Sequence, residues 1–183
     1  GPAGGNLPVC AVYFAGTTGS PSLYNDNDTV RNCNIYDYFK SNSHTAGLML
    51  VDGNKSVSIL NNKFYQTASR TYSSSNLDHH FILINNVNGD GFTVSGNTLG
   101  YSSSSSTGTY TLQSPSQGNF YGVNINVGIS VPTLIRNNTI ANIQLNGNWN
   151  SANLINVAEG NVSVDSNTIG SQTGNSINYT TLN

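Results

Sequence analysis

The segment LDHH, residues 77–80, contains the densest group of titratable residues in the chain. Asp78 could orient a histidine, and histidine is the side chain whose ordinary pKa suits a general base near neutral pH. The segment leads directly into the apolar run FILI at 81–84, which predicts a strand. Because adjacent side chains of a strand point to opposite faces, His79 and His80 cannot both serve one site. No serine nucleophile motif accompanies them, so we predict no catalytic centre here.

Carboxylate and metal chemistry are also poorly supported by the sequence. Eight Asp plus Glu residues among 183 are too few to build an acid-rich catalytic groove. The segment YNDNDT at 24–29 offers Asp26 and Asp28 as oxygen ligands for Ca²⁺, but it lacks the full spacing of a calcium loop. We therefore expect a solvated turn there, with calcium as the less favoured alternative, and no other metal or cofactor.

The strands that would position any functional site are predicted by a sequence pattern that repeats along the chain. Four segments share one pattern, in which an Asn stands between an apolar residue three positions earlier and another two positions later. They are VSILNNKFY (57–65), FTVSGNTLG (92–100), LIRNNTIAN (134–142) and VSVDSNTIG (162–170). With Cys33 filling the slot in an earlier copy, the slot residues are Cys33, Asn62, Asn97, Asn138 and Asn167. Both flanking positions are apolar in all five copies, which chance would rarely produce in so polar a chain.

The spacing of these copies predicts the fold. Successive slots lie 29–41 residues apart, within the range typical of solenoid repeats. A second short apolar run precedes each copy, and no window shows the 3.6-residue periodicity of a helix. The pattern predicts an all-β parallel β-helix of about five coils, in which equivalent strands stack ~4.8 Å apart.

We interpret the slot residues as an internal asparagine ladder. An Asn at the same corner of each coil can bond to the equivalent Asn above and below, and can satisfy backbone groups freed at the bend. Asn also tolerates the left-handed backbone of a sharp corner. Cys33 is expected to end the ladder, because a thiol is small and readily buried. All five slot residues are therefore predicted to be structural.

These motifs resemble the right-handed parallel β-helix repeats of secreted bacterial proteins, an architecture also used by pectate lyases and polygalacturonases. The segments NNTIANI, NTIGSQTGNSINYTT and GTTGSPSLYNDNDTVRNCNI more narrowly resemble repeats of very large surface proteins of gliding and gut-type bacteria. Those proteins are typically exported by the type IX pathway and described as adhesin-like. The resemblance extends from about Val9 to Asn183 and implies a right-handed helix in a secreted or cell-surface protein. It does not imply an activity, because the fold serves lyases, hydrolases, adhesins and stalks alike.

The predicted domain organisation is simple. Residues 1–6 are interpreted as the remnant of a cleaved tag or a linker, and residues 7–183 as one β-helix. Both ends of the sequence lie directly in predicted strands, and no polar capping segment is visible. We therefore expect the β-helix to be a fragment of a longer solenoid.

Segments of variable length separate the repeats and are rich in aromatic residues. If the coils stack, these insertions emerge from one corner and build one face, which in solenoids is often the binding face. Rings beside amides are typical of glycan-binding surfaces, although the same rings could simply pack the loops onto the helix. The predicted binding residues on this loop face are Tyr65, Tyr72, His79, Tyr101, Tyr110, Tyr121 and Trp149.

The composition argues against several functional classes. Only 8% of the residues are charged, the net charge is −2 and the isoelectric point is near 5.8, so we expect no binding of nucleic acid. No apolar run approaches the ~20 residues needed to cross a bilayer, and we expect no membrane insertion. Cys10 and Cys33 fit either one disulfide in an oxidising compartment or two free thiols.

The leading functional prediction is a non-catalytic adhesin or stalk at a bacterial cell surface, with glycans and the neighbouring domains of its parent protein as partners. The alternatives are a polysaccharide-active enzyme, either lyase or glycoside hydrolase, and a structural filament or phage-fibre module. The Arg-x-Lys element of a polygalacturonase-like site is missing from the chain. A pectate-lyase-like site would need a calcium-binding acidic cluster beside a basic residue, and the acids near the predicted coils stand on different turns.

Overall fold

The computed structural model describes residues 7–17, 20–171 and 176–181, so the predicted tag remnant at residues 1–6 lies outside it. The described chain is all-β apart from one short 3-10 helix, η1 (Pro21–Leu23). Each pair of neighbouring strands in the described chain is parallel. The predicted all-β class and parallel pairing are therefore confirmed.

Most strands belong to three sheets, which we call the long sheet and the first and second short sheets. The long sheet has the order β1 (Cys10–Phe14), β5 (Thr45–Val51), β10 (Asp78–Asn86), β13 (Tyr110–Val127), β16 (Ile143–Glu159) and β19 (Ile177–Thr180), with β9 (Arg70–Thr71) beside β13. The first short sheet has the order β17 (Val162–Asp165), β14 (Thr133–Arg136), β11 (Thr93–Ser95), β7 (Ser58–Leu60) and β3 (Thr29–Arg31). The second has the order β18 (Thr168–Ile169), β15 (Thr139–Ala141), β12 (Thr98–Gly100), β8 (Lys63–Tyr65) and β4 (Asn34–Tyr36). Strands β2 (Asn25–Asp26) and β6 (Asn54–Lys55) form a further pair.

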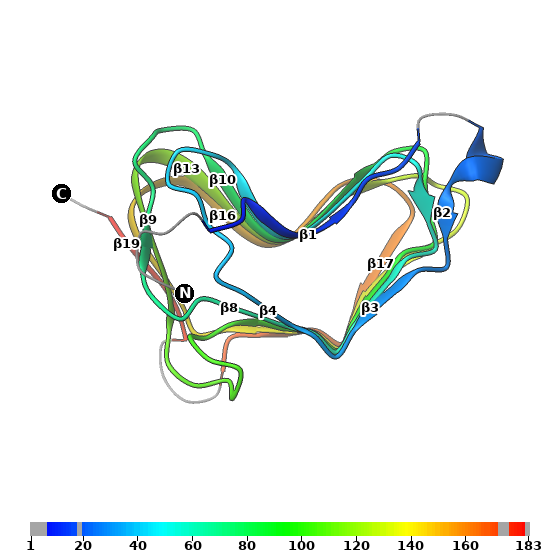
Figure 1. Ribbon diagram of the computed structural model, residues 1–183. Coiled ribbons are helices and arrows are strands. Elements are labelled where there is room, and N and C mark those ends of the chain that lie inside the picture. The colour runs from blue at the N-terminus through cyan, green and yellow to red at the C-terminus, as the bar shows by residue number, and fades with distance from the viewer. Residues whose placement is uncertain (1–6, 18–19, 172–175, 182–183) are drawn as a thin grey trace.

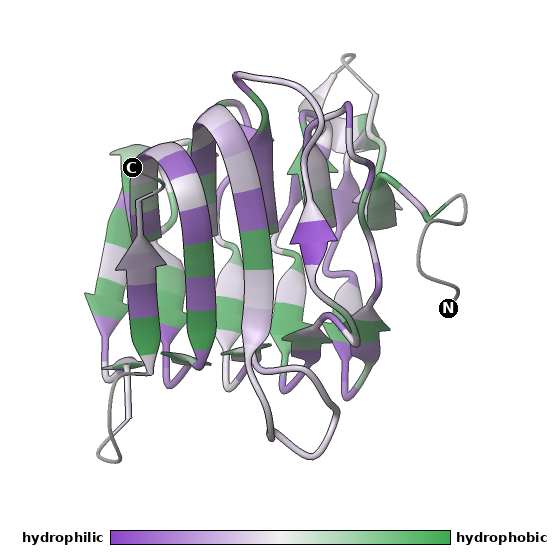
Figure 2. Ribbon diagram, turned by 90° about the vertical axis from the view of Figure 1, so that its left-hand side faces the viewer, coloured by the Kyte–Doolittle hydropathy of each residue, from purple (hydrophilic) through white to green (hydrophobic). Residues whose placement is uncertain are grey.

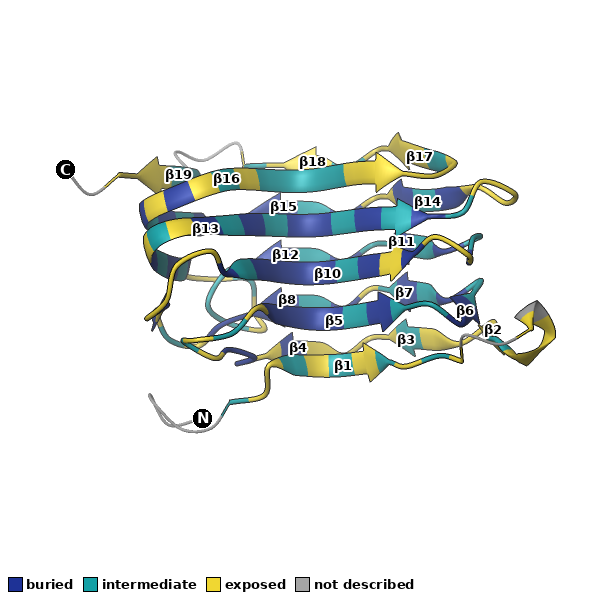
Figure 3. Ribbon diagram, turned by 90° about the horizontal axis from the view of Figure 1, so that it is seen from above, coloured by how far each residue is buried: buried dark blue, intermediate teal, exposed yellow. Residues whose placement is uncertain are grey.

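The chain visits the three sheets in a fixed sequence. From β5 in the long sheet it passes to β7 in the first short sheet and β8 in the second, and it then returns to the long sheet at β10, beside β5. Each strand is thus laid next to its counterpart from the previous circuit, which makes the pairs parallel. Figure 1 looks along the resulting stack, and Figure 3 shows the strands of each sheet side by side. Strands of two to four residues persist because most of them are hydrogen-bonded on both sides.

Register aligns the apolar positions of the repeats into two columns. The column in the first short sheet contains Val30, Ile59, Val94, Ile135 and Val164. The column in the second contains Ile35, Phe64, Leu99, Ile140 and Ile169. The middle members of both columns are fully buried, whereas Val164 and Ile169 stand on the edge strands and are 47% and 53% exposed. Burial of such a side chain contributes ~1.5–3 kcal/mol, so the columns stabilise strands that are too short to persist alone.

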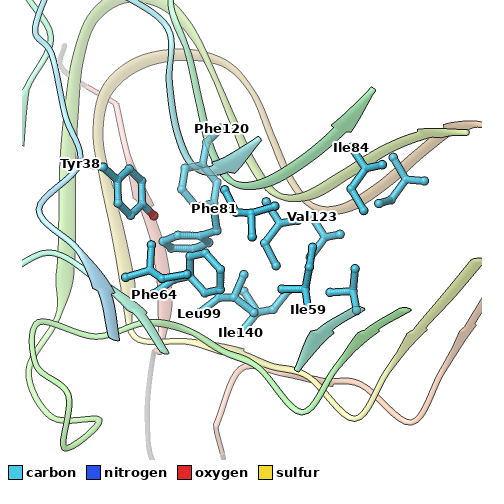
Figure 4. Close-up of a cluster of buried hydrophobic side chains, with 14 of the residues drawn as sticks. Tyr38, Ile59, Phe64, Phe81, Ile84, Leu99, Phe120, Val123 and Ile140 are labelled. Atoms are coloured by element: carbon cyan, nitrogen blue, oxygen red, sulfur yellow. The ribbon is translucent and has the colours of Figure 1, made fainter. Parts of the chain in front are cut away.

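Aromatic rings fill the space between the long sheet and the second short sheet. The Phe81 ring stands edge-on to the rings of Tyr110 and Phe120, with centroids 4.7 and 5.5 Å away. Figure 4 shows Phe81 and Phe120 pointing from the long sheet toward Phe64 and Leu99 on the opposite side. All five side chains are fully buried, so this cluster joins the two sheets.

A left-handed backbone residue precedes every ladder slot. These corner residues have φ between 55° and 69°, and they are Asn32, Asn61, Gly96, Asn137 and Ser166. Most L-residues are strained in this region, whereas Gly lacks the Cβ clash and Asn is several-fold enriched there. The corner therefore explains why a second Asn so often stands beside the ladder Asn.

The slot residues form a directional hydrogen-bonded ladder. The backbone N–H groups of Cys33, Asn62, Asn97 and Asn138 each donate to the Oδ1 of the next slot Asn, at 2.9–3.0 Å. The side-chain amides of Asn62, Asn97 and Asn138 donate to the same acceptors at 2.9–3.1 Å. Each acceptor thus comes from the later strand of the pair. The expected bonding between slot amides is present, but Cys33 contributes its backbone N–H, while its thiol is exposed and donates to the carbonyl of Arg31.

Candidate functional site

The loop-face prediction needs correction, because most of its rings lie inside the protein. Five of the seven residues are buried, and these are Tyr65, Tyr72, His79, Tyr110 and Trp149. Tyr101 and Tyr121 are half-buried. For Tyr110 and Trp149 the physical reason is that the insertions extend β13 and β16 of the long sheet, and both side chains belong to the buried core. Tyr72 and His79 pack against these two rings, and Tyr65 stacks on Tyr36. A buried ring cannot stack on a sugar, so the five do not form a binding face.

His79 is the centre of a buried hydroxyl cluster. Its Nδ1 lies 2.7 Å from the hydroxyl of Thr45 and 2.9 Å from that of Tyr72, and its Nε2 lies 2.6 Å from the Tyr110 hydroxyl. Burial lowers the pKa of His79 to about 3, with a further contribution from His80. The imidazole is therefore neutral at ordinary pH and has partners at both nitrogens. It holds the core together and cannot reach a substrate.

Asp37 and Arg70 form a second buried polar cluster. Arg70 Nη2 lies 2.8 Å from Asp37 Oδ1, and both side chains are almost fully buried. Burial alone would raise the pKa of the Asp37 carboxyl, but hydrogen bonds from Thr67 and Arg70 outweigh it and lower the pKa. The Nε of Arg70 also donates to Gln66 at 3.2 Å. The pair fastens the segment between β8 and β10 to the preceding circuit.

The outer face of the long sheet is bent into a concave surface. In β10, two neighbouring residues, Phe81 and Ile82, both point into the core, so the regular alternation of the strand is interrupted. Gly47 and Gly122 stand beside Phe81 in the adjacent strands, and a side chain at either would collide with neighbouring atoms. A Cβ on Gly122, for example, would meet the carbonyl oxygen of Leu154. Figure 1 shows the resulting inward bend midway along the sheet.

A groove of about 380 Å³ lies on this outer face across β10, β13 and β16. Its polar lining consists of Asp78, His80, Asn85, Tyr121, Asn124, Asn126 and Asn156. Its apolar lining consists of Leu83, Ile84 and Ala158. Along β13 the polar residues Asn124 and Asn126 alternate with the core residues Val123 and Ile125. Figure 2 shows a similar alternation of hydrophilic and hydrophobic bands on other parts of the long strands. This groove is the candidate functional site.

His80 forms one wall of the groove together with Tyr121. Their rings are stacked with centroids 4.8 Å apart and planes 8° from parallel. The Nε2 of His80 accepts a bond from the Asn124 amide at 3.2 Å, and the ring also bonds to the Thr45 backbone. Burial lowers the pKa of His80 to about 4 despite the nearby Asp78 carboxylate. His80 is thus neutral at ordinary pH and has partners for its ring nitrogens.

The Asp78 carboxylate is hydrogen-bonded through one oxygen. Its Oδ1 accepts from the Asn119 amide at 2.7 Å, and its Oδ2 lies 3.3 Å from His44 Nδ1. The backbone N–H of Asp78 donates to the same His44 nitrogen, so that nitrogen acts as an acceptor and supplies no hydrogen bond to Oδ2. His79 lies in the core and His80 lines the outer groove, as expected for neighbours on a strand. Among the described residues, the Asp78 Oδ2 therefore receives no hydrogen bond, whereas the ring nitrogens of His80 both have partners.

Other polar atoms of the groove keep spare bonding capacity. Asn156 donates to Asn124 at 2.8 Å, and Asn126 donates to Asn85 at 3.2 Å, which forms two short rows across adjacent strands. Within the described chain, the carbonyl oxygens of Asn156 and Asn126 accept no hydrogen bond, and that of Asn126 is shielded from solvent. The hydroxyl of Tyr121 likewise has no partner among the described residues. The groove thus offers amides and a hydroxyl to a ligand.

The predicted calcium ligands and the two cysteines have ordinary surroundings in the structure. Asp26 pairs with Lys55 at 3.2 Å on the β2–β6 pair, and Asp28 lies exposed beyond it. Among the residues described, no group of three or more His, Cys, Asp or Glu side chains stands close enough to share a metal ion. Cys10 and Cys33 are both free thiols. Within the same residues, no helix has the length and apolar character that crossing a membrane requires.

Sequence reasoning missed the groove although part of its signal was present. The run VNINV at 123–127 places Asn at alternate positions between apolar residues, and the run NLINV at 153–157 places Asn156 between two apolar residues. That alternation predicts polar side chains on the outer face of two neighbouring strands. The concavity that brings them together depends on the bend at Phe81 and Gly122, which no local pattern reveals.

Comparison of the chain with protein-family models, with curated protein sequences and with solved structures finds no match.

Proposed function

We propose that the chain is a right-handed parallel β-helix of about five coils, and that it acts as a non-catalytic adhesin or stalk module of a secreted, surface-attached bacterial protein. The fixed order in which the chain visits three parallel sheets supports the helix, as does the unbroken ladder from Cys33 to Asn167. Each circuit then corresponds to one coil. Repeats of this kind make a stiff rod, since each coil contacts only its neighbours along the axis.

The observation that carries the non-catalytic assignment is the state of the acid and base groups. A general base needs an unoccupied atom within reach of the substrate. His79 is buried in the core, and His80 has partners at its ring nitrogens. The Asp78 Oδ1 accepts from Asn119, so the Asp78 Oδ2 has no second unoccupied acid or base beside it in the groove lining. The groove therefore favours binding over proton transfer.

Glycans are the partners that the outer surface of the long sheet best fits. Amide and hydroxyl groups both donate and accept hydrogen bonds, which matches the hydroxyl groups of sugars. The half-buried Tyr121 and Asn124 provide such groups on the outer face. A rod that carries this surface would attach its parent protein to a glycan-coated substrate, while the neighbouring domains anchor it to the cell.

A degradation assay tests this function against the enzyme alternative. The purified protein is incubated with a panel of neutral and acidic polysaccharides, and polymer length is followed by size-exclusion chromatography and by the release of reducing ends. We expect polymer length to stay unchanged while the protein is retained on one or more immobilised glycans. Chain shortening that disappears in His80→Asn, with Gln144→Ala as a control on the same sheet outside the groove, would overturn the non-catalytic assignment.

A filament module is the second candidate, and the edge strands favour it. Val164 and Ile169 continue the buried columns but are half-exposed on β17 and β18, where another copy could stack. Asp165 of β17 and Arg31 of β3 belong to one outward column, so head-to-tail stacking would bring opposite charges together. Analytical ultracentrifugation over a range of protein concentrations decides the matter. Species that grow with concentration, and that Asp165→Arg abolishes, would support a filament, whereas a constant monomer would exclude it.

A further inference from the structure

The groove extends along the stack, which limits the shape of its ligand. It crosses β10, β13 and β16, three neighbouring strands of the long sheet, and so runs from one strand level to the next. Figure 3 shows these strands side by side on the face that carries the groove. Parallel strands lie ~4.8 Å apart, which is close to the length of one hexose unit in an extended chain. A linear polymer laid along the stack would therefore present about one unit to each strand.

The polar atoms in the groove repeat at the same interval. The register pairs Leu83 with Asn124 and Asn124 with Asn156, so this outward column has one member on each of the three strands. The Asn156 amide donates to Asn124, and the carbonyl oxygen of Asn156 remains without a partner in the described chain. Asn85 and Asn126 form a second, parallel row. Hydroxyl groups of successive sugar units can exchange hydrogen bonds with such rows, because an amide offers both donors and acceptors.

The apolar part of the lining suits the carbon side of a sugar ring. Leu83 is half-buried and Ala158 is exposed, and both lie beside the amide rows. Tyr121 gives one face of its ring to His80, so the pair forms a flat wall. The groove thus combines apolar surface with polar groups that fix orientation, which is the usual composition of a small-molecule site.

The charges around the groove exclude an acidic ligand as the preferred one. Its lining contains no Lys or Arg, and its one carboxylate, Asp78, accepts a hydrogen bond from Asn119. His80 carries no positive charge at neutral pH, because burial lowers its pKa. A uronate or sulfated chain would find no cation to pair with and would be repelled by Asp78.

We infer that the groove binds a linear, uncharged oligosaccharide that lies along the stacking direction across β10, β13 and β16. This assignment rests on the proposed adhesive function and specifies its ligand. The Asn124–Asn156 row bonds the hydroxyl groups of successive units, Leu83 contacts a ring face, and the His80–Tyr121 pair closes one side.

The test is a calorimetric titration of the protein with neutral oligosaccharides of increasing length, namely gluco-, xylo- and manno-oligosaccharides, with oligogalacturonates as acidic comparators. Affinity for one neutral series is expected to rise with length until three strands are covered and then to stay constant. It is also expected to change little with added salt, since no charge pair is involved.

Two variants and a control locate the binding. Asn156→Ala removes an outward amide at the end of the row, and Asn124→Ala removes its centre, and each is expected to weaken binding about tenfold. The control is Asn146→Ala, which removes a half-buried amide of the same strand, β16, outside the groove. It should bind like the parent protein, and circular dichroism with thermal unfolding verifies that all three variants are folded.

The outcomes separate this inference from the function on which it rests. If oligogalacturonates bind better than every neutral series, the adhesive function stands and the uncharged ligand is wrong. If neutral chains bind but both groove variants bind equally well, the ligand lies elsewhere and the groove assignment fails. If no oligosaccharide binds at any length, the inference fails together with the glycan part of the proposed function. If the chains are shortened during titration, the non-catalytic function itself is overturned.

Discussion

Asparagines inside the corner and asparagines on the outer face of the long sheet stand in the same stack but are bonded very differently. The Oδ1 of Asn97 accepts two bonds from Asn62, and its Nδ2 donates to Ile59 and Asn138. Asn97 is 1% exposed and uses its full bonding capacity. Asn156, by contrast, is half-buried and makes one side-chain bond. A saturated inner amide can only stabilise the fold, whereas an unsaturated outer amide remains available to a ligand.

The two histidines of β10 also lie on the inner and outer faces, and their titration gives the largest expected effect on stability. Burial lowers the pKa of His79 to about 3 and that of His80 to about 4. An unfolded histidine titrates near ~6.5, so below that pH the unfolded chain binds more protons than the folded one. The free energy of unfolding should therefore fall as the pH drops from ~6.5 toward 4, by up to ~1.4 kcal/mol per pH unit for each histidine. Urea unfolding at a series of pH values measures the slope.

Variants show whether the inner histidine, His79, causes this pH dependence of the free energy of unfolding. His79→Gln should unfold more easily at neutral pH but show a shallower pH dependence, because one buried neutral imidazole is gone. Asn146→Ala, which removes no titratable group from the same sheet, should keep the parent slope. Tyr38, Tyr72 and Tyr110 surround His79 and stay neutral throughout this range, since burial raises their pKa values. The lowered pKa of Asp37 acts below the ordinary carboxyl range and so outside this window. A parent protein with constant stability from pH 7 to pH 4 would contradict the sealed state of His79.

The second largest effect is expected from an inner amide. Asn138→Ala removes the acceptor of two bonds from Asn97 and the donor to Val94. The Asn97 side-chain amide keeps its bond to Ile59, while the Asn97 backbone N–H and the Val94 carbonyl each lose a buried partner. Each such group costs ~1–3 kcal/mol, partly relieved by water or rearrangement, so we expect a loss of ~3 kcal/mol. Urea unfolding at neutral pH provides the measurement. An unfolding midpoint equal to that of the parent would show that the ladder does not carry stability.

An outer amide should matter much less to stability. Asn156→Ala removes one half-exposed bond to Asn124, and the Asn124 carbonyl can turn to water. We expect a loss below ~1 kcal/mol by the same urea assay. If Asn156→Ala lowered the free energy of unfolding as much as Asn138→Ala, the outer amide row would be structural too and the contrast between inner and outer amides would be wrong.

The smallest effect is expected at the start of the ladder. Cys33 supplies a backbone N–H to Asn62 but no side-chain amide. Cys33→Asn should add the missing side-chain donor and raise stability by ~0.5 kcal/mol, because the site is exposed and the net value of such a bond is small. Thermal unfolding beside Cys33→Ser, which removes the thiol without adding an amide, isolates the gain. A Cys33→Asn protein that is less stable than Cys33→Ser would mean that an amide cannot turn inward at this slot.

The sequence by itself determined the repeated part of this protein. The flanking positions of each slot, such as Ile59 and Phe64 around Asn62, proved to be aligned apolar columns with a bonded amide between them. This was readable because every circuit repeats the same local requirements: an apolar residue facing inward, a left-handed corner and an amide at the bend. Local chemistry that recurs in each copy leaves its pattern in the sequence.

Only the tertiary structure decided the direction of the insertions and the shape of the outer face. Tyr110 and Trp149 stand in segments without a repeat, and they turn inward because the extended β13 and β16 leave space that the core must fill. Phe81 and Gly122 belong to strands far apart in the chain, and the groove exists because close packing between these strands bends the sheet. Such contacts depend on the combined volumes of residues from neighbouring circuits. A local sequence pattern does not contain this information, because the residues are far apart in the chain.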